Sequence, residues 1–261
     1  MKTGSILIYV LWSLSFVSFI LMLITGGLYF YRGTLARTSE NYMQSLEMLA
    51  VAKASLAEVR NRVFLSKNPQ GVVYAKKEFR YQNRLYSVVV EPEDAKLSIN
   101  AANAQSMERL LTLLGTEQGR ARDISQRLVT ERKQRVFLSL LELKAYMSQE
   151  EYTRAKEKMT IVPTLVNVNY ASPLVLQAVG FSRDEADHIV SLRERLEHFS
   201  KQTLKPIFPG KEVIIETALY SSVLPQYFRI SVMLDKGPFS HGIFCIFEKT
   251  GYIVDCGRND E

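Results

Sequence analysis

An uncharged, largely apolar run from Ser5 to Tyr31 constrains this chain more than any other feature. At a rise of 1.5 Å per residue, a helix over this run is about 40 Å long, enough to cross a hydrocarbon core of about 30 Å with some tilt. A secretory signal has a shorter apolar region of about 7–15 residues, and the small residues Thr25, Gly26 and Gly27 fit its cleavage site poorly. The run therefore predicts a membrane helix over residues 5–31, for which an ordinary signal anchor is the plainest interpretation.

Only four residues precede the apolar run, one of them basic and the last a glycine, Gly4. This start resembles a type IV prepilin leader, residues 1–4. The resemblance implies that a prepilin peptidase cuts the bond between Gly4 and Ser5 on the cytoplasmic side and leaves the helix attached. A lone glycine before a membrane helix has low specificity, so this interpretation depends on the rest of the chain.

Tyr9, the fifth residue of the implied mature chain, stands where most pilins and pseudopilins carry a glutamate. A carboxylate in a membrane helix is costly unless it meets a cation, which in pilins is the N-terminal ammonium of the neighbouring subunit. A subunit with nothing ahead of it in the fibre has no such partner. Tyr9 therefore fits the tip of a fibre, and it fits equally a protein that is not a pilin.

The composition is that of an ordinary globular protein beyond the membrane helix. The chain has 261 residues, 47% of them hydrophobic and 23% charged, which leaves room for one or two compact domains. The net charge is +6, but basic residues alternate with acidic ones, so no patch for nucleic acid or lipid is indicated. Cys245 and Cys256 allow either one disulfide in an oxidising compartment or two buried thiols.

The spacing of apolar residues predicts an α+β fold. Steps of three and four predict an amphipathic stem helix over residues 32–67 that lies on a soluble domain and stops at residues 68–71. Residues 68–99 and 206–261 are rich in valine and aromatic residues and predict a pilin-like antiparallel sheet. The expected strands are residues 72–80, 85–90, 227–234, 242–247 and 252–256. The apolar face of the stem consists of Tyr42, Leu46, Leu49, Ala52, Leu56, Val59 and Val63.

Residues 100–205 are predicted to form an all-α domain inserted into this sheet, with a degenerate internal repeat. Residues 98–102 and 167–171 share the pattern x-[IV]-N-x-A, and each precedes a short helix. The helices are expected at residues 107–114 and 173–179, and they end at Gly115 and Gly180. We interpret the two copies as SAM-like or helix-hairpin-helix units.

The second copy carries clear signals for the start of a helix. Ser172 and Pro173 provide an N-cap followed by proline at the first helical position, and residues 182–185 form a capping box for the next helix. Asn100 and Asn169 each precede a short helix, where their side chains can satisfy unpaired backbone groups. We therefore expect the motif residues to be structural. They are Asn100, Asn167, Asn169, Ser172 and Gly180.

Taken together, Gly4, Tyr9 and residues 137–143, 147–152 and 166–172 resemble the minor pseudopilin K family of type II secretion systems. The resemblance implies a pilin fold with a helical insertion, a complex with minor pseudopilins I and J, and a role in capping or initiating the periplasmic pseudopilus during protein export. It also implies processing by prepilin peptidase with N-methylation at Ser5. The chain is then expected to cross the inner membrane once, with a cytoplasmic N-terminus and a periplasmic soluble part.

Two features depart from the family. Its members usually carry an acidic, tryptophan-bearing segment after the first short helix, whereas residues 120–135 are basic here and Trp12 is the only tryptophan. Some members bind calcium, but Glu91, Glu93 and Asp94 have no spacing typical of a calcium site. We expect these three to be surface carboxylates. The resemblance leaves calcium binding open, with ligands that are unknown, and no other cofactor is expected.

The main alternative is a membrane-anchored DNA receptor of the competence type, whose helix-hairpin-helix repeat residues 168–199 also resemble. Hairpins that bind DNA use a turn of the G-x-G type, with exposed backbone amides that meet phosphates. The turn here is Val179-Gly180-Phe181-Ser182, in which the second glycine is missing. The hairpin is therefore predicted to be a packing element, and no nucleic acid is expected as a partner.

An enzyme is the third class of protein considered. His188, His198 and His241 lack the spacing of metal ligands, and no nucleophile elbow, P-loop or paired-glycine fingerprint is present. We find no catalytic constellation and expect the chain not to be an enzyme.

The two cysteines are predicted on neighbouring strands of a C-terminal hairpin, in one of two registers. A two-residue turn at Thr250-Gly251 places Cys245 opposite Cys256, at a hydrogen-bonded position with Cα atoms about 5.5 Å apart, which allows a disulfide. A longer loop over residues 248–251 places Cys245 opposite Val254 instead. The sequence leaves both registers open.

Overall fold

The computed structural model describes residues 3–60, 75–82, 84–195, 200–222, 224–234 and 242–258. The chain divides into two compact units, residues 1–47 and residues 48–261. The first unit is helical throughout its described part and belongs to α1 (Thr3–Arg60). The predicted membrane and stem helices are therefore one helix, and the predicted stop at residues 68–71 lies outside the described residues.

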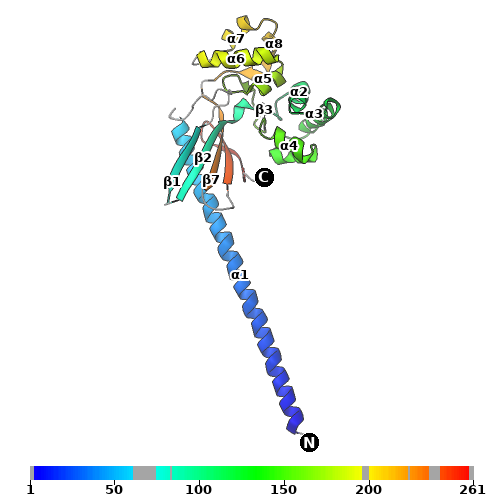
Figure 1. Ribbon diagram of the computed structural model, residues 1–261, viewed down its shortest axis with the longest axis vertical. Coiled ribbons are helices and arrows are strands. Elements are labelled where there is room, and N and C mark those ends of the chain that lie inside the picture. Colours follow the sequence, from blue (N-terminus) through cyan, green and yellow to red (C-terminus); the bar gives the residue numbers. More distant parts are fainter. Residues whose placement is uncertain are drawn as a thin grey trace. The chain divides into compact units, whose positions relative to one another are not determined.

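The second unit contains a five-stranded antiparallel sheet in the order β1-β2-β7-β8-β9 (Figure 1). Every predicted strand is present, within a few residues at its described ends, and residues 72–74 of the first predicted strand lie outside the described residues. The strands are β1 (Ala75–Tyr81), β2 (Arg84–Pro92), β7 (Tyr227–Leu234), β8 (Gly242–Glu248) and β9 (Ile253–Arg258). Alternate residues of β2 and β7 are buried, as expected for strands with one face on a core.

The last turns of α1 pack on that face of the sheet. Met48, Val51, Ala52 and Leu56 form one apolar cluster with side chains of β2, β7 and β8. Ala52 and Leu56 belong to the predicted stem face, but Tyr42 and Leu46 are exposed by 64% and 42%. Within the second unit, the stem therefore packs on the sheet from Met48 onward, and Val63 of the predicted face lies outside the described residues.

A block of short helices is inserted between β2 and β7, which are hydrogen-bonded neighbours. We call residues 97–220 the helical block, and the 3₁₀ helix η1 (Glu93–Ala95) leads into it. Its strands are β3 (Leu97–Ser98), β4 (Met159–Thr160), β5 (Val166–Asn167) and β6 (Leu219–Tyr220). Its helices are α2 (Ala104–Leu113), α3 (Gln118–Arg132), η2 (Leu140–Ala145), α4 (Gln149–Ala155), α5 (Pro173–Val179), α6 (Arg183–Arg195), α7 (Lys201–Ile207) and α8 (Glu212–Thr217).

The predicted end of the helical domain at Lys205 is wrong. Helices α7 and α8 and strand β6 continue the block to Tyr220, because β6 pairs in parallel with β5 and not with the large sheet. Likewise β3, predicted among the pilin-like strands of residues 68–99, pairs in parallel with β4. The two small parallel pairs close a single apolar core inside the block, which includes Met107, Leu110, Ile124, Leu176 and Ile189.

Candidate functional site

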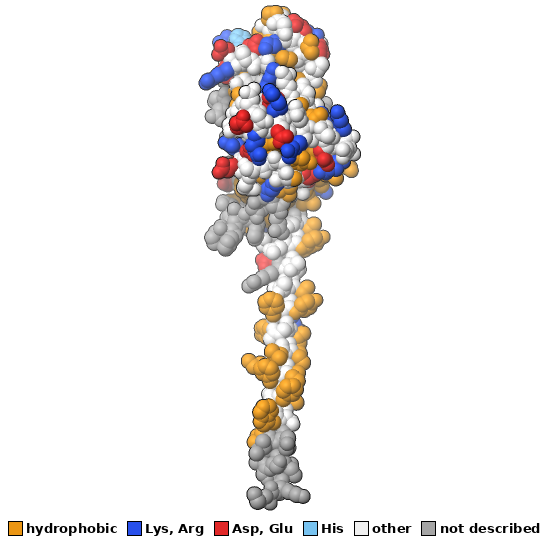
Figure 2. Space-filling model, turned by 90° about the vertical axis from the view of Figure 1, so that its right-hand side faces the viewer, with side chains coloured by type: hydrophobic (Ala, Val, Ile, Leu, Met, Phe, Trp, Pro, Cys, Tyr) orange, Lys and Arg blue, Asp and Glu red, His pale blue; other side chains and the backbone are white. Residues whose placement is uncertain are grey.

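The described side chains of α1 between Leu11 and Tyr31 are almost all apolar and lie exposed. Trp12, Met22 and Phe30 are exposed by 74% to 79%, and Figure 2 shows side chains of this type in orange along the helix. Among the described residues, α1 is the one helix that is long and apolar enough to cross a membrane. Large apolar side chains at this density are unfavourable in water, so the helix is compatible with a membrane anchor.

The candidate processing residues lie at the start of the same helix. Backbone helix begins at Thr3, so Gly4, Ser5 and Tyr9 all belong to the first two turns of α1. The predicted leader, residues 1–4, is thus continuous with the helix where it is described. These three residues stand apart in the sequence from the remaining candidates, which lie in the helical block and at β8 and β9.

The helical block consists of two halves that repeat one local structure, as Figure 1 shows for the hairpins α2–α3 and α5–α6. In the first half, residues 97–160, the amide of Ala102 donates to the carbonyl of Ser98. In the second half, residues 166–220, the amide of Ala171 donates to the carbonyl of Asn167 over the same 2.9 Å. The degenerate repeat in the sequence thus corresponds to a strand and a turn that lead into a helix hairpin.

The two glycines of the repeat end their helices in the same way. Gly115 has φ of 90° and Gly180 has φ of 125°, a region that side chains rarely enter. The next residue closes the turn in both cases: Thr116 donates to Leu111 over 2.9 Å, and Phe181 donates to Leu176 over 3.2 Å. Both helices therefore end in a Schellman-type turn that reverses the chain into the second helix of the hairpin.

An arginine from the second helix of each hairpin holds the turn of its own half. The Arg132 guanidinium donates to the carbonyls of Ile99 (3.0 Å) and Ala102 (2.7 Å), and Arg193 donates to Ala171 over 2.7 Å. Burial lowers the pKa of Arg193 to about 9 and also lowers the pKa of Arg132. This pair of arginines was not predicted from the sequence, because charged residues on a helix usually indicate a solvated face.

Asn100 binds backbone groups, but these groups lie far along the chain and not in the turn beside it. Its Nδ2 donates to the carbonyls of Phe137 (2.9 Å) and Ile161 (2.6 Å), and its Oδ1 accepts from the amide of Phe137 (3.0 Å). The cap of α2 is Asn103, whose Oδ1 accepts from Ser106 over 2.7 Å. Asn100 therefore fastens two distant loops to the turn after β3.

The corresponding residues of the second half bind the segment that returns to the sheet. Asn167 is fully buried, and Oδ1 accepts from the amide of Asn169 over 3.2 Å. Nδ2 of Asn169 donates to the carbonyl of Ser222 over 3.2 Å. Ser172, at the position predicted for the N-cap, accepts from Val175 over 3.4 Å. The motif therefore links β5 to the chain that follows β6.

The backbone amides at the two hairpin turns already have partners, which argues against DNA binding. The Glu117 carboxylate accepts from Gly119 and Arg120 at the start of α3, over 2.8 and 2.9 Å. At the second turn, the amide of Phe181 donates to the carbonyl of Leu176 over 3.2 Å, and the amide of Ser182 donates to the Glu185 carboxylate over 2.6 Å. A Cβ at Gly180 would lie only 2.6 Å from Ile214 of α8, so α8 covers this turn. A phosphate would have to displace these contacts.

Glu93 and Asp94 are buried, so the expectation that they are surface carboxylates is wrong. Both have an exposed fraction of 0%. Glu93 accepts from Lys96 over 2.8 Å and takes a bidentate pair of bonds from Arg229 over 2.9 and 3.1 Å. Burial alone would raise the pKa of Glu93, but Lys96 and Arg229 outweigh it and hold the pKa at about 2. Glu93 thus links η1 to β7 through its ion pair with Arg229.

Among the described residues, no cation pairs with Asp94 in this way. Its Oδ2 accepts from the amide of Gln226 over 2.7 Å and from the hydroxyl of Tyr220, while its buried Oδ1 has no hydrogen-bond partner. Burial and, to a smaller extent, the negative charge of Glu93 raise the pKa of Asp94 to about 7, although the hydrogen bond from Gln226 acts in the opposite direction. Asp94 therefore titrates near neutral pH.

No metal centre is evident in the described ranges, since no three His, Cys, Asp or Glu side chains within them are arranged to hold an ion. No calcium ligands are therefore identified among the described residues for the ion that some members of the resembling family bind. His188 is exposed, and its ring meets the edge of Phe208 with centroids 5.8 Å apart. His198 and His241 lie outside the described residues.

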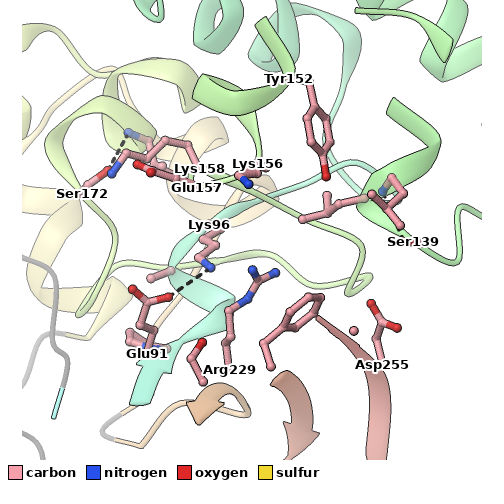
Figure 3. Close-up of a pocket in the computed structure, with 18 of the residues that line it drawn as sticks. Glu91, Lys96, Ser139, Tyr152, Lys156, Glu157, Lys158, Ser172, Arg229 and Asp255 are labelled. Carbon is pink, nitrogen blue, oxygen red and sulfur yellow. Dashed lines mark hydrogen bonds and ion pairs between the residues drawn. The ribbon is translucent and has the colours of Figure 1, made fainter. Parts of the chain in front are cut away.

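A cleft of about 520 Å³ lies between the outer face of the sheet and the helical block. Figure 3 shows Tyr152 on one wall, opposite Arg229 on the sheet. The Arg229 guanidinium stacks over Phe244 at 4.7 Å, and Phe244 lies so close to Gly257 that a Cβ there would clash at 2.8 Å. Both signs of charge line the cleft, so it selects no single class of ligand. The charged residues are Glu91, Lys96, Lys156, Glu157, Lys158, Arg229 and Asp255.

Cys245 and Cys256 face each other and form a disulfide with Cα atoms 4.2 Å apart. This distance is typical of a non-hydrogen-bonded pair, not of the hydrogen-bonded pair expected from the sequence. Neither predicted turn is present: Phe247 pairs with Ile253, and an irregularity between Ile246 and Phe247 then shifts the register by one residue. The bulge brings the cysteines together.

Comparison with solved structures gives an informative match. No family model matches the chain, and no curated protein matches it in sequence. The structure is similar to a chain of the crystal structure of the GspK-GspI-GspJ complex from the type 2 secretion system of enterotoxigenic Escherichia coli. The TM-score is 0.64 at 14% sequence identity, over 87% of this chain and 99% of that one. At this identity the match shows a shared fold, and it confirms the predicted α+β class with a long N-terminal helix.

Proposed function

We propose that this chain is a K-type minor pseudopilin of a type II secretion system, which caps or initiates the periplasmic pseudopilus and so supports protein export. The observation that carries the proposal is the match over 99% of a chain from the GspK-GspI-GspJ complex. A match of that extent includes more than a helix and a sheet, because the helical block makes up much of the second unit. The apolar surface of α1 supports an anchor in the inner membrane.

The partners follow from the same comparison. The similar chain is part of a complex with two further pseudopilins, and we propose I-type and J-type minor pseudopilins as partners of this chain. The test is co-purification of the full chain in detergent with these two proteins from the same cell. A stable three-protein complex is expected. A chain that stays alone, or that instead binds duplex DNA in a salt-dependent manner, contradicts the proposal.

Processing at the N-terminus tests the pilin character separately from the partners. We propose that prepilin peptidase, a further partner, cleaves between Gly4 and Ser5 and that the new N-terminus is methylated. Mass spectrometry of the membrane protein is expected to show a chain that begins at Ser5. A Gly4→Leu variant serves as the control and is expected to remain uncleaved. An intact wild-type chain in cells with active peptidase, or a start near Gly27, contradicts the proposal.

Tyr9 is proposed as the residue that suits a position at the tip. It offers no carboxylate to the ammonium of a preceding subunit, so the chain has no means of extending the fibre by that contact. Quantitative mass spectrometry of isolated pseudopili is expected to find far fewer copies of this chain than of the major subunit. Tyr9→Glu is expected to leave the folding of residues 48–261 unchanged. Equal abundance with the major subunit contradicts a role at the tip.

A further inference from the structure

The chain passes twice between the sheet and the helical block, and both passages meet at Asp94. The outgoing passage is η1, between β2 and β3. The return passage, residues 220–222 and 224–227, leads from β6 to β7. Asp94 of the outgoing passage accepts hydrogen bonds from Tyr220 and Gln226 at the two ends of the return passage. One carboxyl group thus joins both passages.

The charged and titratable groups around Asp94 leave its carboxylate without a counter-ion. Glu93, its neighbour on η1, is negative and takes up both Lys96 and Arg229. The other groups that face Asp94 are tyrosines from the turn after β5, from β6 and from β7. Burial and then the charge of Asp94 raise the pKa of Tyr170 to about 12, and burial, Glu248 and Asp94 raise the pKa of Tyr227.

We propose that Asp94 is a proton-operated latch: its neutral carboxyl group holds the two passages together, and its ionisation releases the return passage from η1. The neutral form keeps Oδ2 as the acceptor for Tyr220 and Gln226, and its proton can reside on Oδ1, which accepts no bond. The ionised form places a second buried negative charge beside Glu93, with no cation left to offset it.

The direction of the pH effect follows from proton linkage. The pKa of Asp94 is raised from 3.8 to about 7 in the folded chain, so the closed latch binds a proton more tightly than the open one. Below pH 3.8, the pKa of the open form, the closed latch has its full stability. This stability is lost as the pH rises through about 7, the pKa of the closed form. Between about pH 5.5 and about pH 8.5, the opening equilibrium is expected to increase on the order of 30-fold.

Hydrogen exchange on the full chain in detergent micelles tests the latch. Protection of the return passage, read at Gln226, is compared at about pH 5.5 and about pH 8.5 after correction for the intrinsic exchange rate, with α3 as the internal reference. The wild type is expected to lose protection at the higher pH by a factor on the order of 30. Asp94→Asn, which keeps an acceptor but cannot ionise, is expected to be equally protected at both values. Glu91→Gln, which removes a partly exposed carboxylate nearby, is expected to behave as wild type.

Three outcomes overturn the latch. They are a wild-type chain whose protection at Gln226 does not depend on pH, an Asp94→Asn variant that keeps the full pH dependence, and a Glu91→Gln variant that loses it. The first outcome needs no variant, so the test holds even if Asp94→Asn folds poorly. The inference rests on the described junction alone and is independent of the proposed role in secretion.

Discussion

The two halves of the helical block share a fold but differ in what their asparagines bind. In the first half, Asn100 binds Phe137 and also Ile161, the residue directly after β4, so it joins the start of that half to its end. In the second half, Asn169 binds Ser222, which lies on the passage back to the sheet. The first half is therefore an internally fastened unit, whereas the second half carries the connection to the rest of the molecule. Matched substitutions in the two halves separate these roles.

The largest difference is expected at the glycines. Gly180→Ala is expected to cost about 3 kcal/mol of folding stability, because a Cβ meets Ile214 at 2.6 Å and Arg109 at 3.0 Å at a positive φ. Gly115→Ala is expected to cost about 1 kcal/mol, since its Cβ meets only the flexible end of Arg154 at 3.2 Å. Urea unfolding of both variants in micelles measures the gap. Equal costs would mean that α8 can move away from the second turn.

The second largest difference in stability is expected between the asparagine variants of the two halves. Asn100→Ala is expected to cost about 2 kcal/mol, because it leaves the amide of Phe137 and two carbonyls without their partner. Asn169→Ala removes the bond to Ser222 and is expected to cost about 1 kcal/mol. The same unfolding series measures both. An Asn169→Ala chain that is as stable as wild type but no longer joins its partner proteins would place this motif in an interface.

The helix caps are expected to be nearly equal in the two halves. Asn103→Ala and Ser172→Ala each remove one side-chain acceptor from the first turn of a helix, and each is expected to cost about 1 kcal/mol. The cap bond of Ser172 is longer, 3.4 Å against 2.7 Å, so its cost is expected to be the smaller of the two. Thermal unfolding of the two variants gives the comparison. A reversed order would show that the length of the cap bond does not determine the cost of losing it.

The smallest effect is expected at the ion pair between α3 and α4. The hydrogen bonds from Arg120 hold the pKa of Glu151 at about 2, below its ordinary value of 4.5. This stability is present above the ordinary value and is lost as the pH falls toward about 2. Arg120 is 49% exposed, so Arg120→Ala is expected to lower the folding stability only slightly at neutral pH and not at all in acid. Unfolding at the two pH values checks this, and a cost that persists in acid would point to lost packing.

The features that were predictable from the sequence are those fixed by neighbouring residues. The strands followed from their valine and aromatic residues, and the caps at Ser172 and Ser182 followed from residues within one turn. The glycines that end α2 and α5 were also visible, because a positive φ at a helix end favours glycine. The end of the block was missed because α7 and α8 are too short for a periodic signal.

The interactions that were not predictable join residues far apart in the chain. Asn100 finds partners 37 and 61 residues away, and Glu93 meets Arg229 136 residues away. A single sequence contains no signal for such pairs, so two adjacent acids read as surface residues. The cysteine pairing was foreseen as one of two registers, but the bulge that produces it was not. For the candidate site, therefore, residue types were recognised while their partners were not.

The insertion between β2 and β7 has a consequence for the order of events in folding. The two strands are neighbours in the sheet, yet Glu93 and Arg229 at their ends are separated by 136 residues. Closing an unstructured loop of that length is slow, because its entropy must be lost before any strand contact forms. A block that folds first replaces the long loop by a short bridge whose two ends already lie side by side. The rate at which the sheet forms is then limited by the helical block and not by the strands themselves.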